Sequence, residues 1–193
     1  VYYIHHVDVQ TPLEEMLRAL DDLVHQGKVR YIACSNYEAW RLCDSLWTSE
    51  ANGLARFECY QPQYSLVVRD IEQELIPLCL AKGVGVAAWS PLAGGFLTGK
   101  YRTRGDVARS ERRGEIAEYL TRSGLRVLAA LDMVASEQES TPAAVSLAWL
   151  LSKPNVVAPV VSASRAEHVD DFATATRLRL SRHQLLELDR ASS

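Results

Sequence analysis

Short apolar segments that alternate with helical stretches run through this whole chain, and they constrain its fold more than any other feature. Five such segments each end in a polar or aromatic residue, and they cover 2–5, 29–36, 57–61, 84–90 and 156–162. Strand then helix, repeated, is typical of a parallel sheet whose strand ends meet at one edge. We therefore expect an α/β fold, a parallel β/α barrel that builds its site from the carboxyl ends of several strands.

The length of the chain limits how much of a barrel it can form. An eight-stranded barrel typically needs about 250 residues, whereas this chain has 193 residues and opens directly on a strand. We expect residues 1–193 to be a single domain of the (β/α)8 TIM barrel type, supplying about the last five β/α units, with the N-terminal three units absent. The edges of segments 2–5 and 156–161 would then be exposed, which predicts self-association of the isolated chain.

Recognisable capping sequences mark the starts of the predicted helices. The predicted caps are Thr11, Asp70, Ser164 and Ser181, with capping boxes at Thr11 and Ser164, where an acidic residue follows three positions later. The predicted helices cover 11–26, 36–49, 70–82, 123–138, 142–153, 164–176 and a short stretch from 181 onward. Residues 91–114 break the pattern, since a glycine-rich loop is followed by a run of arginines. The stretch 102–113 is expected to be a solvated, mobile loop, and the alternative is that it folds over a bound nucleotide.

Composition excludes several classes of function. The net charge of −3 and the absence of a basic run alternating with aromatic residues give no sign of nucleic-acid binding. No apolar run reaches the roughly 18 residues that a membrane span needs, and the first residues show no signal peptide. The four cysteines, which form no CxxC pair, are expected to be reduced and structural: Cys34, Cys43, Cys59 and Cys79. Together these features predict a cytoplasmic protein.

The loops that follow the last two predicted strands have the composition of a phosphate site. Residues 90–95 end in two glycines, and residues 162–165 hold two serines and Arg165. Glycine lets a backbone approach a phosphate closely, and arginine can bind it with two parallel hydrogen bonds. Barrels often bind phosphate at these two loops. Taken alone, however, the same residues would serve equally well as a helix cap at Ser164 and a simple turn.

Polar and aromatic residues at the other strand ends fit a nicotinamide ring. Ser35, Asn36 and Gln61 supply the hydroxyl and amide groups that a carboxamide needs, and Trp89 offers a flat face for stacking. Each residue also has an ordinary structural alternative, because caps and turns use amides and a lone tryptophan is commonly a core residue. At the end of the first segment, His5 precedes His6. Since adjacent strand residues point to opposite faces, we expect no metal site there and a hydrogen-bonding role for His5.

These segments together make the chain resemble the aldo-keto reductase family over essentially its whole length. The matching stretches are 2–8, 27–36, 61–66, 89–101 and 188–192, in the family's order and spacing. The resemblance is closer to the short-loop bacterial and potassium-channel β-subunit-like branch than to aldose reductase. It implies a barrel that binds NADP(H) and an enzyme that reduces aldehydes or ketones.

The resemblance also implies a role for each candidate residue. His5 matches the active-site histidine that orients and polarises the substrate carbonyl. The residues matched to the cofactor are Ser35, Asn36 and Gln61 for the carboxamide, Trp89 for the ring, Ser90, Leu92, Gly94 and Leu97 for the pyrophosphate, and Ser162, Ser164, Arg165 and His168 around the adenosine 2′-phosphate. The match at Ser164 and Arg165 favours NADP over NAD.

The chain also departs from the family pattern. Ala33 and Ser162 stand where the family commonly has glycine, His168 replaces a glutamine or arginine, and Phe172 replaces an asparagine, so one adenine contact is expected to be lost. The family's catalytic aspartate, tyrosine and lysine match no residue here and are expected to precede the chain.

We therefore expect the parent protein to be an NADP(H)-dependent oxidoreductase acting on a small carbonyl substrate, and the isolated chain to be inactive. Two alternatives remain open. One is a nucleotide-binding regulatory or redox-sensing subunit, and the other is an inactive truncated product.

Overall fold

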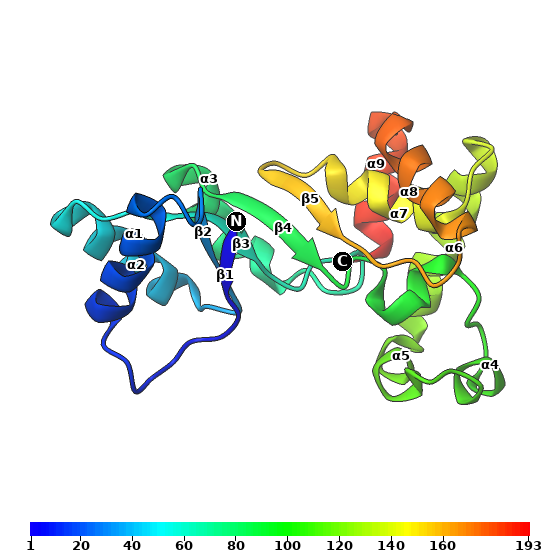
Figure 1. Cartoon of the computed structure of the whole chain (residues 1–193). Coiled ribbons are helices and arrows are strands. Elements are labelled where there is room, and N and C mark those ends of the chain that lie inside the picture. The colour runs from blue at the N-terminus through cyan, green and yellow to red at the C-terminus, as the bar shows by residue number, and fades with distance from the viewer. The chain divides into compact units, whose positions relative to one another are not determined.

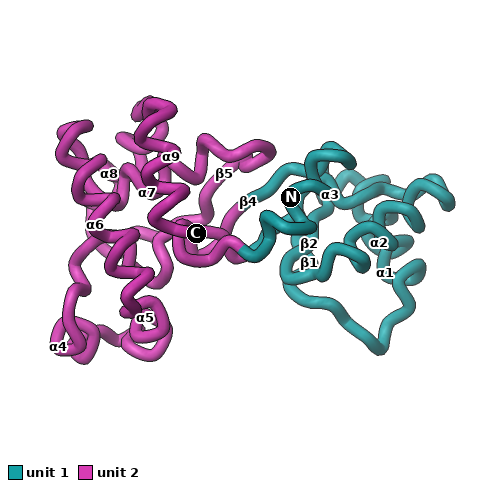
Figure 2. Tube along the Cα trace, turned by 180° about the vertical axis from the view of Figure 1, so that it is seen from behind, with its two compact units in different colours: residues 1–62, 70–87 teal, residues 63–69, 88–193 magenta.

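The computed structural model describes residues 1–193, which form two compact units. Unit 1 comprises residues 1–62 and 70–87, and unit 2 comprises residues 63–69 and 88–193 (Figure 2). The chain therefore passes between the units three times, after residues 62, 69 and 87. The expectation of a single domain stays a prediction.

Five strands follow one another in chain order in the sheet (Figure 1). They are β1 (Tyr2–Ile4), β2 (Ile32–Ser35), β3 (Phe57–Gln61), β4 (Gly85–Trp89) and β5 (Val156–Val160). The pairs β1–β2, β2–β3 and β3–β4 are parallel, and the register of β2 on β3 shifts by one residue after Ile32. The predicted α/β class with five parallel strands is confirmed, although β2 begins later than the sequence pattern predicts.

Unit 1 packs its helices against the first strands. The elements are α1 (Leu13–His25), α2 (Ala39–Asn52), the 3-10 helix η1 (Asp70–Glu72) and α3 (Leu75–Lys82). The helices α1 and α2 each bury one face. Leu17 of α1 and Leu42 of α2 are fully buried, and so is Ile32 of β2. The Tyr60 hydroxyl donates to the carbonyl oxygen of Tyr37 at 2.7 Å, so the buried hydroxyl in this core has a hydrogen-bond partner.

Two predicted caps of unit 1 are wrong. Thr11 does not cap α1, because its hydroxyl donates to the Asp8 carboxylate at 2.6 Å and the helix begins after Pro12. This hydrogen bond, with another from the Gln10 amide, lowers the pKa of Asp8. Asp70 heads η1 rather than a long helix, since the chain leaves helical geometry at Glu74 before α3 begins.

Unit 2 contains helices where a loop was predicted. Residues 91–114 include the 3-10 helix η2 (Ala93–Thr98), α4 (Arg104–Ala108) and the start of α5 (Arg113–Tyr119). Thr103 forms a capping box with Asp106, a pattern that the run of arginines concealed. The prediction of a loop over this stretch is therefore wrong. The remaining helices are α6 (Arg122–Glu137), α7 (Pro142–Leu151), α8 (Glu167–Arg177) and α9 (Arg182–Ala191).

The last two helix caps differ in outcome. Ser181 and Gln184 form a complete capping box at the start of α9, which confirms the predicted helix start. The capping box predicted at Ser164 is wrong, because Ala166 already has helical backbone angles and α8 has no side-chain cap. A turn bond from the His168 amide to the Arg165 carbonyl, at 3.3 Å, precedes the helix instead.

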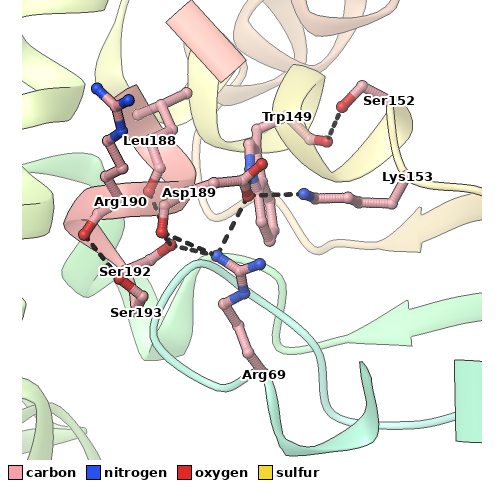
Figure 3. Close-up of polar contacts among 9 residues, drawn as sticks. All are labelled: Arg69, Trp149, Ser152, Lys153, Leu188, Asp189, Arg190, Ser192 and Ser193. Atoms are coloured by element: carbon pink, nitrogen blue, oxygen red, sulfur yellow. Dashed lines mark hydrogen bonds and ion pairs between the residues drawn. The ribbon is translucent and has the colours of Figure 1, made fainter. Parts of the chain in front are cut away.

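An ion-pair cluster joins three separate segments of unit 2 (Figure 3). The Asp189 carboxylate accepts hydrogen bonds from Lys153 Nζ at 2.7 Å and from Trp149 Nε1 at 3.0 Å, and it pairs with Arg69 at 3.2 Å. Burial opposes the charged form of Asp189, yet the donors from Lys153 and Trp149 together with Arg69 lower its pKa. Trp149 itself is fully buried and packs edge-on against Tyr64.

Two further expectations concern the state of the cysteines and the presence of membrane-spanning helices. All four cysteines are free, as predicted, but only Cys34 and Cys79 are buried, while Cys43 is exposed on α2. Burial raises the pKa of Cys79 to about 11, so its thiol stays protonated. None of the helices combines the length and the apolar character needed to cross a membrane.

Candidate functional site

In unit 1, the ends of the first three strands hold four of the predicted site residues together. Ser35 and Gln61 face each other in the parallel register of β2 and β3, and the Ser35 hydroxyl donates to the Gln61 carbonyl oxygen at 2.6 Å. Asn36 follows directly, and its Nδ2 donates to the carbonyl oxygen of His5 at 3.1 Å. Asn36 has a left-handed φ of 59°, a conformation that asparagine tolerates better than most residues.

The phenol of Tyr3, close to this group of residues, has a pKa too high for an efficient proton donor at neutral pH. The Tyr3 hydroxyl donates to Cys59 Sγ at 3.4 Å, and burial together with that contact raises the pKa of Tyr3 to about 12. A general acid works best with a pKa near the operating pH. Tyr3 therefore does not replace the family's proton-donating tyrosine.

His5 and His6 lie differently from the sequence-based expectation. The strand β1 ends at Ile4, so the alternation of faces does not extend to the two histidines. Their rings are in contact, with centroids 4.3 Å apart and planes tilted by 49°. The argument that they point to opposite faces is therefore wrong. No group of three or more His, Cys, Asp or Glu side chains in the structure is arranged to hold a metal ion.

In unit 2, the glycine-rich loop after β4 adopts a run of left-handed backbone conformations. Ser90, Ala93, Gly94 and Gly95 have φ values of 48°, 50°, 63° and 98°. The Gly94 amide donates to the Ser90 hydroxyl at 3.3 Å. The amides of Ala93, Gly95 and Leu97 are also bonded within the loop, to the carbonyl oxygens of Ser90 and Leu92. The same region carries the predicted residues Trp89, Leu92 and Leu97, whose role in phosphate binding stays a prediction.

A carboxylate lies against this loop. Glu115, on α5, accepts a hydrogen bond from the Ser90 hydroxyl at 3.1 Å. A Cβ atom added to Gly94 would lie 2.9 Å from the Glu115 carboxyl carbon and 3.0 Å from both its oxygens. The absence of a side chain at Gly94 is therefore required for the carboxylate to approach.

The loop between β5 and α8 carries the other predicted phosphate residues. Ser162, Ser164 and Arg165 are exposed, and His168 is half-buried. Both loops of unit 2 rest on one apolar cluster of Ala144, Leu147 and Ala175. The side chains packed against that cluster are Leu92 of the glycine-rich loop, Val161 before the second loop, Phe172 of α8, and Leu178.

This cluster gives a physical account of Phe172. Its ring packs against Ala144, Leu147 and Ala175, so it anchors α8 beneath the Ser164–Arg165 loop. Phe172, which stands where the resemblance leads us to expect an asparagine, is therefore a packing residue. Another departure, Ala33, is completely buried in β2.

Sequence reasoning missed Glu115. It lies just beyond the 91–114 stretch, where no element was predicted, and 25 positions from its partner Ser90, so no spacing rule connects the two. The sequence carries no signal for it, because its position depends on α5, in which Ile116 is buried while Ala117 and Glu118 are exposed.

Each unit holds its own group of candidate residues. In unit 1, a hydroxyl and two amides end adjacent strands, which suits a carboxamide that both donates and accepts. In unit 2, a carboxylate contacts the Ser90 hydroxyl and lies against Gly94 of the left-handed turn. Trp89, half-buried, ends β4 beside that turn.

Comparisons with known proteins identify the family of the chain. Residues 1–193 match the family described as "Aldo/keto reductase family". The chain is 34% identical over 189 residues to "Uncharacterized oxidoreductase YrpG" of Bacillus subtilis, covering 98% of the chain and 57% of that protein. It is 32% identical over 190 residues to "Norsolorinic acid reductase" of Aspergillus flavus, covering 98% of the chain and 47% of that protein.

A solved structure of an aldo-keto reductase also matches nearly the whole chain. The chain superposes with a TM-score of 0.77 and 32% identity on a thermostable aldo-keto reductase crystallised with the inhibitor epalrestat, covering 98% of this chain and 58% of that one. The chain therefore spans about half the length of the relatives it matches.

Proposed function

Since this chain belongs to the aldo/keto reductase family, we propose that the protein carrying it is an NADP(H)-dependent oxidoreductase that reduces aldehydes or ketones in a closed (β/α)8 barrel. The observation that carries the proposal is the hydrogen-bonded group at the ends of β1, β2 and β3, where Ser35 contacts Gln61 and Asn36 contacts His5. Three adjacent strands of a barrel deliver side chains to one rim in this way.

The residues of the chain have distinct tasks in this proposal. Ser35, Asn36 and Gln61 hold the nicotinamide carboxamide, and Trp89 supplies a flat face to the ring. When bound, the cofactor supplies hydride to the carbonyl carbon of the substrate. His5 donates a hydrogen bond to the carbonyl oxygen, which positions the carbonyl and polarises it as negative charge develops there. Tyr3, with its raised pKa, keeps its proton.

The phosphates belong to unit 2 in the same proposal. The loop of Ser90, Leu92, Gly94 and Leu97 receives the pyrophosphate, a role supported by the Ser90 hydroxyl, which already donates to a carboxylate, and by the missing side chain at Gly94. The loop of Ser162, Ser164 and Arg165, with His168 behind it, receives the 2′-phosphate. An exposed guanidinium can bind a phosphate with two parallel hydrogen bonds, which favours NADP over NAD.

Titration with NADPH tests the stacking role of Trp89. Binding is expected to quench tryptophan emission, because an indole in contact with the nicotinamide ring loses its excitation energy to it. The Trp89→Phe variant keeps an aromatic ring and should still bind, within about threefold by calorimetry. It should lose most of the quenching.

The other tryptophans make this experiment discriminating. Trp40 and Trp47 are exposed on α2, and Trp149 is buried beside Asp189. Quenching that survives in Trp89→Phe would assign the signal to one of these and contradict the stacking role. Binding without any carbonyl reduction by the whole protein would favour a regulatory, redox-sensing role instead.

Replacement of Arg165 tests the choice of cofactor. In Arg165→Ala, the dissociation constant for NADPH should rise by about tenfold or more, because a charge-assisted hydrogen bond contributes roughly 1.5–3 kcal/mol. The constant for NADH, which lacks the 2′-phosphate, should not change. Arg177→Ala, an exposed arginine in the last turn of α8, is the matched control. Equal losses for both nucleotides would show that Arg165 does not contact the 2′-phosphate.

A further inference from the structure

We propose that Glu115 is an internal competitor for the phosphate position of the glycine-rich loop, so that its carboxylate must leave the loop before a nucleotide's pyrophosphate binds. The inference rests on the proposed nucleotide-binding function and deepens it, since it makes Glu115 a determinant of cofactor affinity. It starts from a contact that the family resemblance does not include.

The Glu115 carboxylate lies directly against Ser90 and Gly94 of the glycine-rich loop. The Ser90 hydroxyl donates to Glu115 Oε1 at 3.1 Å, and the same hydroxyl accepts from the Gly94 amide at 3.3 Å. Both carboxylate oxygens lie 3.0 Å from the point where a Gly94 Cβ would be. The carboxylate therefore fills the space that the missing side chain of Gly94 leaves, and in the proposed function this space lies within the pyrophosphate loop.

The helix α5 holds Glu115 in this position. Ile116 is completely buried, and the Tyr119 ring lies 6.0 Å from that of Phe96 in η2. The Tyr119 hydroxyl also accepts from Gln63 Nε2 at 3.1 Å. With these residues anchored, Glu115 is half-buried against the loop, while Glu118, one turn further, is exposed.

The charges around the loop explain why the two anions exclude each other. Lys100 Nζ lies 3.8 Å from the place of a Gly95 Cβ and 5.0 Å from the Tyr101 ring centroid, and it forms no ion pair with Glu115. A pyrophosphate added beside Glu115 would therefore face an unbalanced like charge at contact distance. Such repulsion is strong where water is partly excluded.

Competition of this kind has a useful consequence for the loop. The hydrogen bonds within the loop, together with the contact of Ser90 with Glu115, hold Ser90 and Gly94 in place before a nucleotide arrives. The carboxylate also lowers the apparent affinity, because only molecules in which Glu115 has moved away can bind phosphate. Rotation of the glutamate side chain to another staggered conformer is sufficient for release.

The test compares Glu115→Gln with Glu118→Gln in the whole protein. Glutamine keeps the acceptor for Ser90 and nearly the same shape, but it removes the negative charge. Glu115→Gln should bind NADPH about tenfold more tightly. Glu118→Gln, on the same helix but facing solvent, should stay within about twofold. Calorimetry with inorganic pyrophosphate alone should show the same order, and this measurement does not depend on the nicotinamide.

The outcomes separate this inference from the proposed function. Unchanged or weaker NADPH binding by Glu115→Gln would overturn the inference and show that Glu115 supports the loop. If no variant binds NADPH but Glu115→Gln gains affinity for pyrophosphate, the proposed function fails and the competition stands. Failure of every variant to bind either compound would overturn the inference as well.

Discussion

Replacing Trp149 with alanine is expected to lower the free energy of unfolding of unit 2 by about 4 kcal/mol, as removal of a large buried aromatic ring does. Trp149 is completely buried in α7 and contacts the Tyr64 ring at a centroid distance of 5.7 Å. The Arg69 guanidinium and Lys153 Nζ lie 5.3 Å and 4.4 Å from its ring centroid. The loss therefore combines a cavity with two cation–π contacts.

Two further variants divide this loss into its parts. Trp149→Phe keeps most of the ring but loses the hydrogen bond from Nε1 to Asp189, and it should cost about 1–2 kcal/mol. Trp47→Ala removes a tryptophan that is 67% exposed and should change stability by less than about 0.5 kcal/mol. Urea unfolding followed by far-UV circular dichroism measures all three. A Trp149→Ala midpoint equal to that of Trp47→Ala would contradict the role of Trp149.

Replacing Gly124 with alanine is expected to destabilise unit 2 by about 3 kcal/mol, because a methyl group at this position has no room. Gly124 lies in the first turn of α6, and its Cβ would overlap the backbone carbonyl oxygen of Tyr119. The same atom would lie 3.1 Å from the Phe96 ring. A backbone oxygen cannot move aside as a flexible side chain can, so the connection between α5 and α6 has to shift.

Gly114→Ala is the matched control for this variant. Gly114 also lies within a helix, α5, but nothing is within 4 Å of its Cβ position. Alanine there should stabilise the protein by about 0.5–1 kcal/mol, since it restricts the unfolded chain and favours helix. The melting temperatures of the two variants should therefore move in opposite directions. A fall of similar size in both would indicate general intolerance of side chains in this region.

The strands could be predicted from the sequence with little error. Runs such as Phe57–Gln61 are apolar and rich in residues that favour strands, and each is followed by a turn or helix signal. Helix caps were less predictable. At Thr11 the capping pattern was present, but the nearby carboxylate of Asp8 competed for the hydroxyl. A local motif cannot show which of two neighbouring partners will win.

The candidate site could also be predicted only in part from the sequence. The contacts among Ser35, Asn36 and Gln61 follow from the rule that adjacent parallel strands end at one edge, so residues at strand ends could be named in advance. The approach of Glu115 to Gly94 depends instead on how α5 packs. That packing rests on contacts of Ile116 and Tyr119 with residues distant in sequence, and spacing does not encode it.

The short segment 63–69 has a practical consequence for anyone who wishes to divide this molecule. It is covalently flanked on both sides by unit 1, but Tyr64 packs on Trp149 and Arg69 pairs with Asp189, both in unit 2. A single cut after residue 87 would therefore leave residues 63–69, which belong to unit 2, covalently attached to unit 1. If the two units are expressed separately, for example as a split reporter, unit 2 is complete only when residues 63–69 are supplied with it. A circular permutation or an added copy of this heptapeptide would do this.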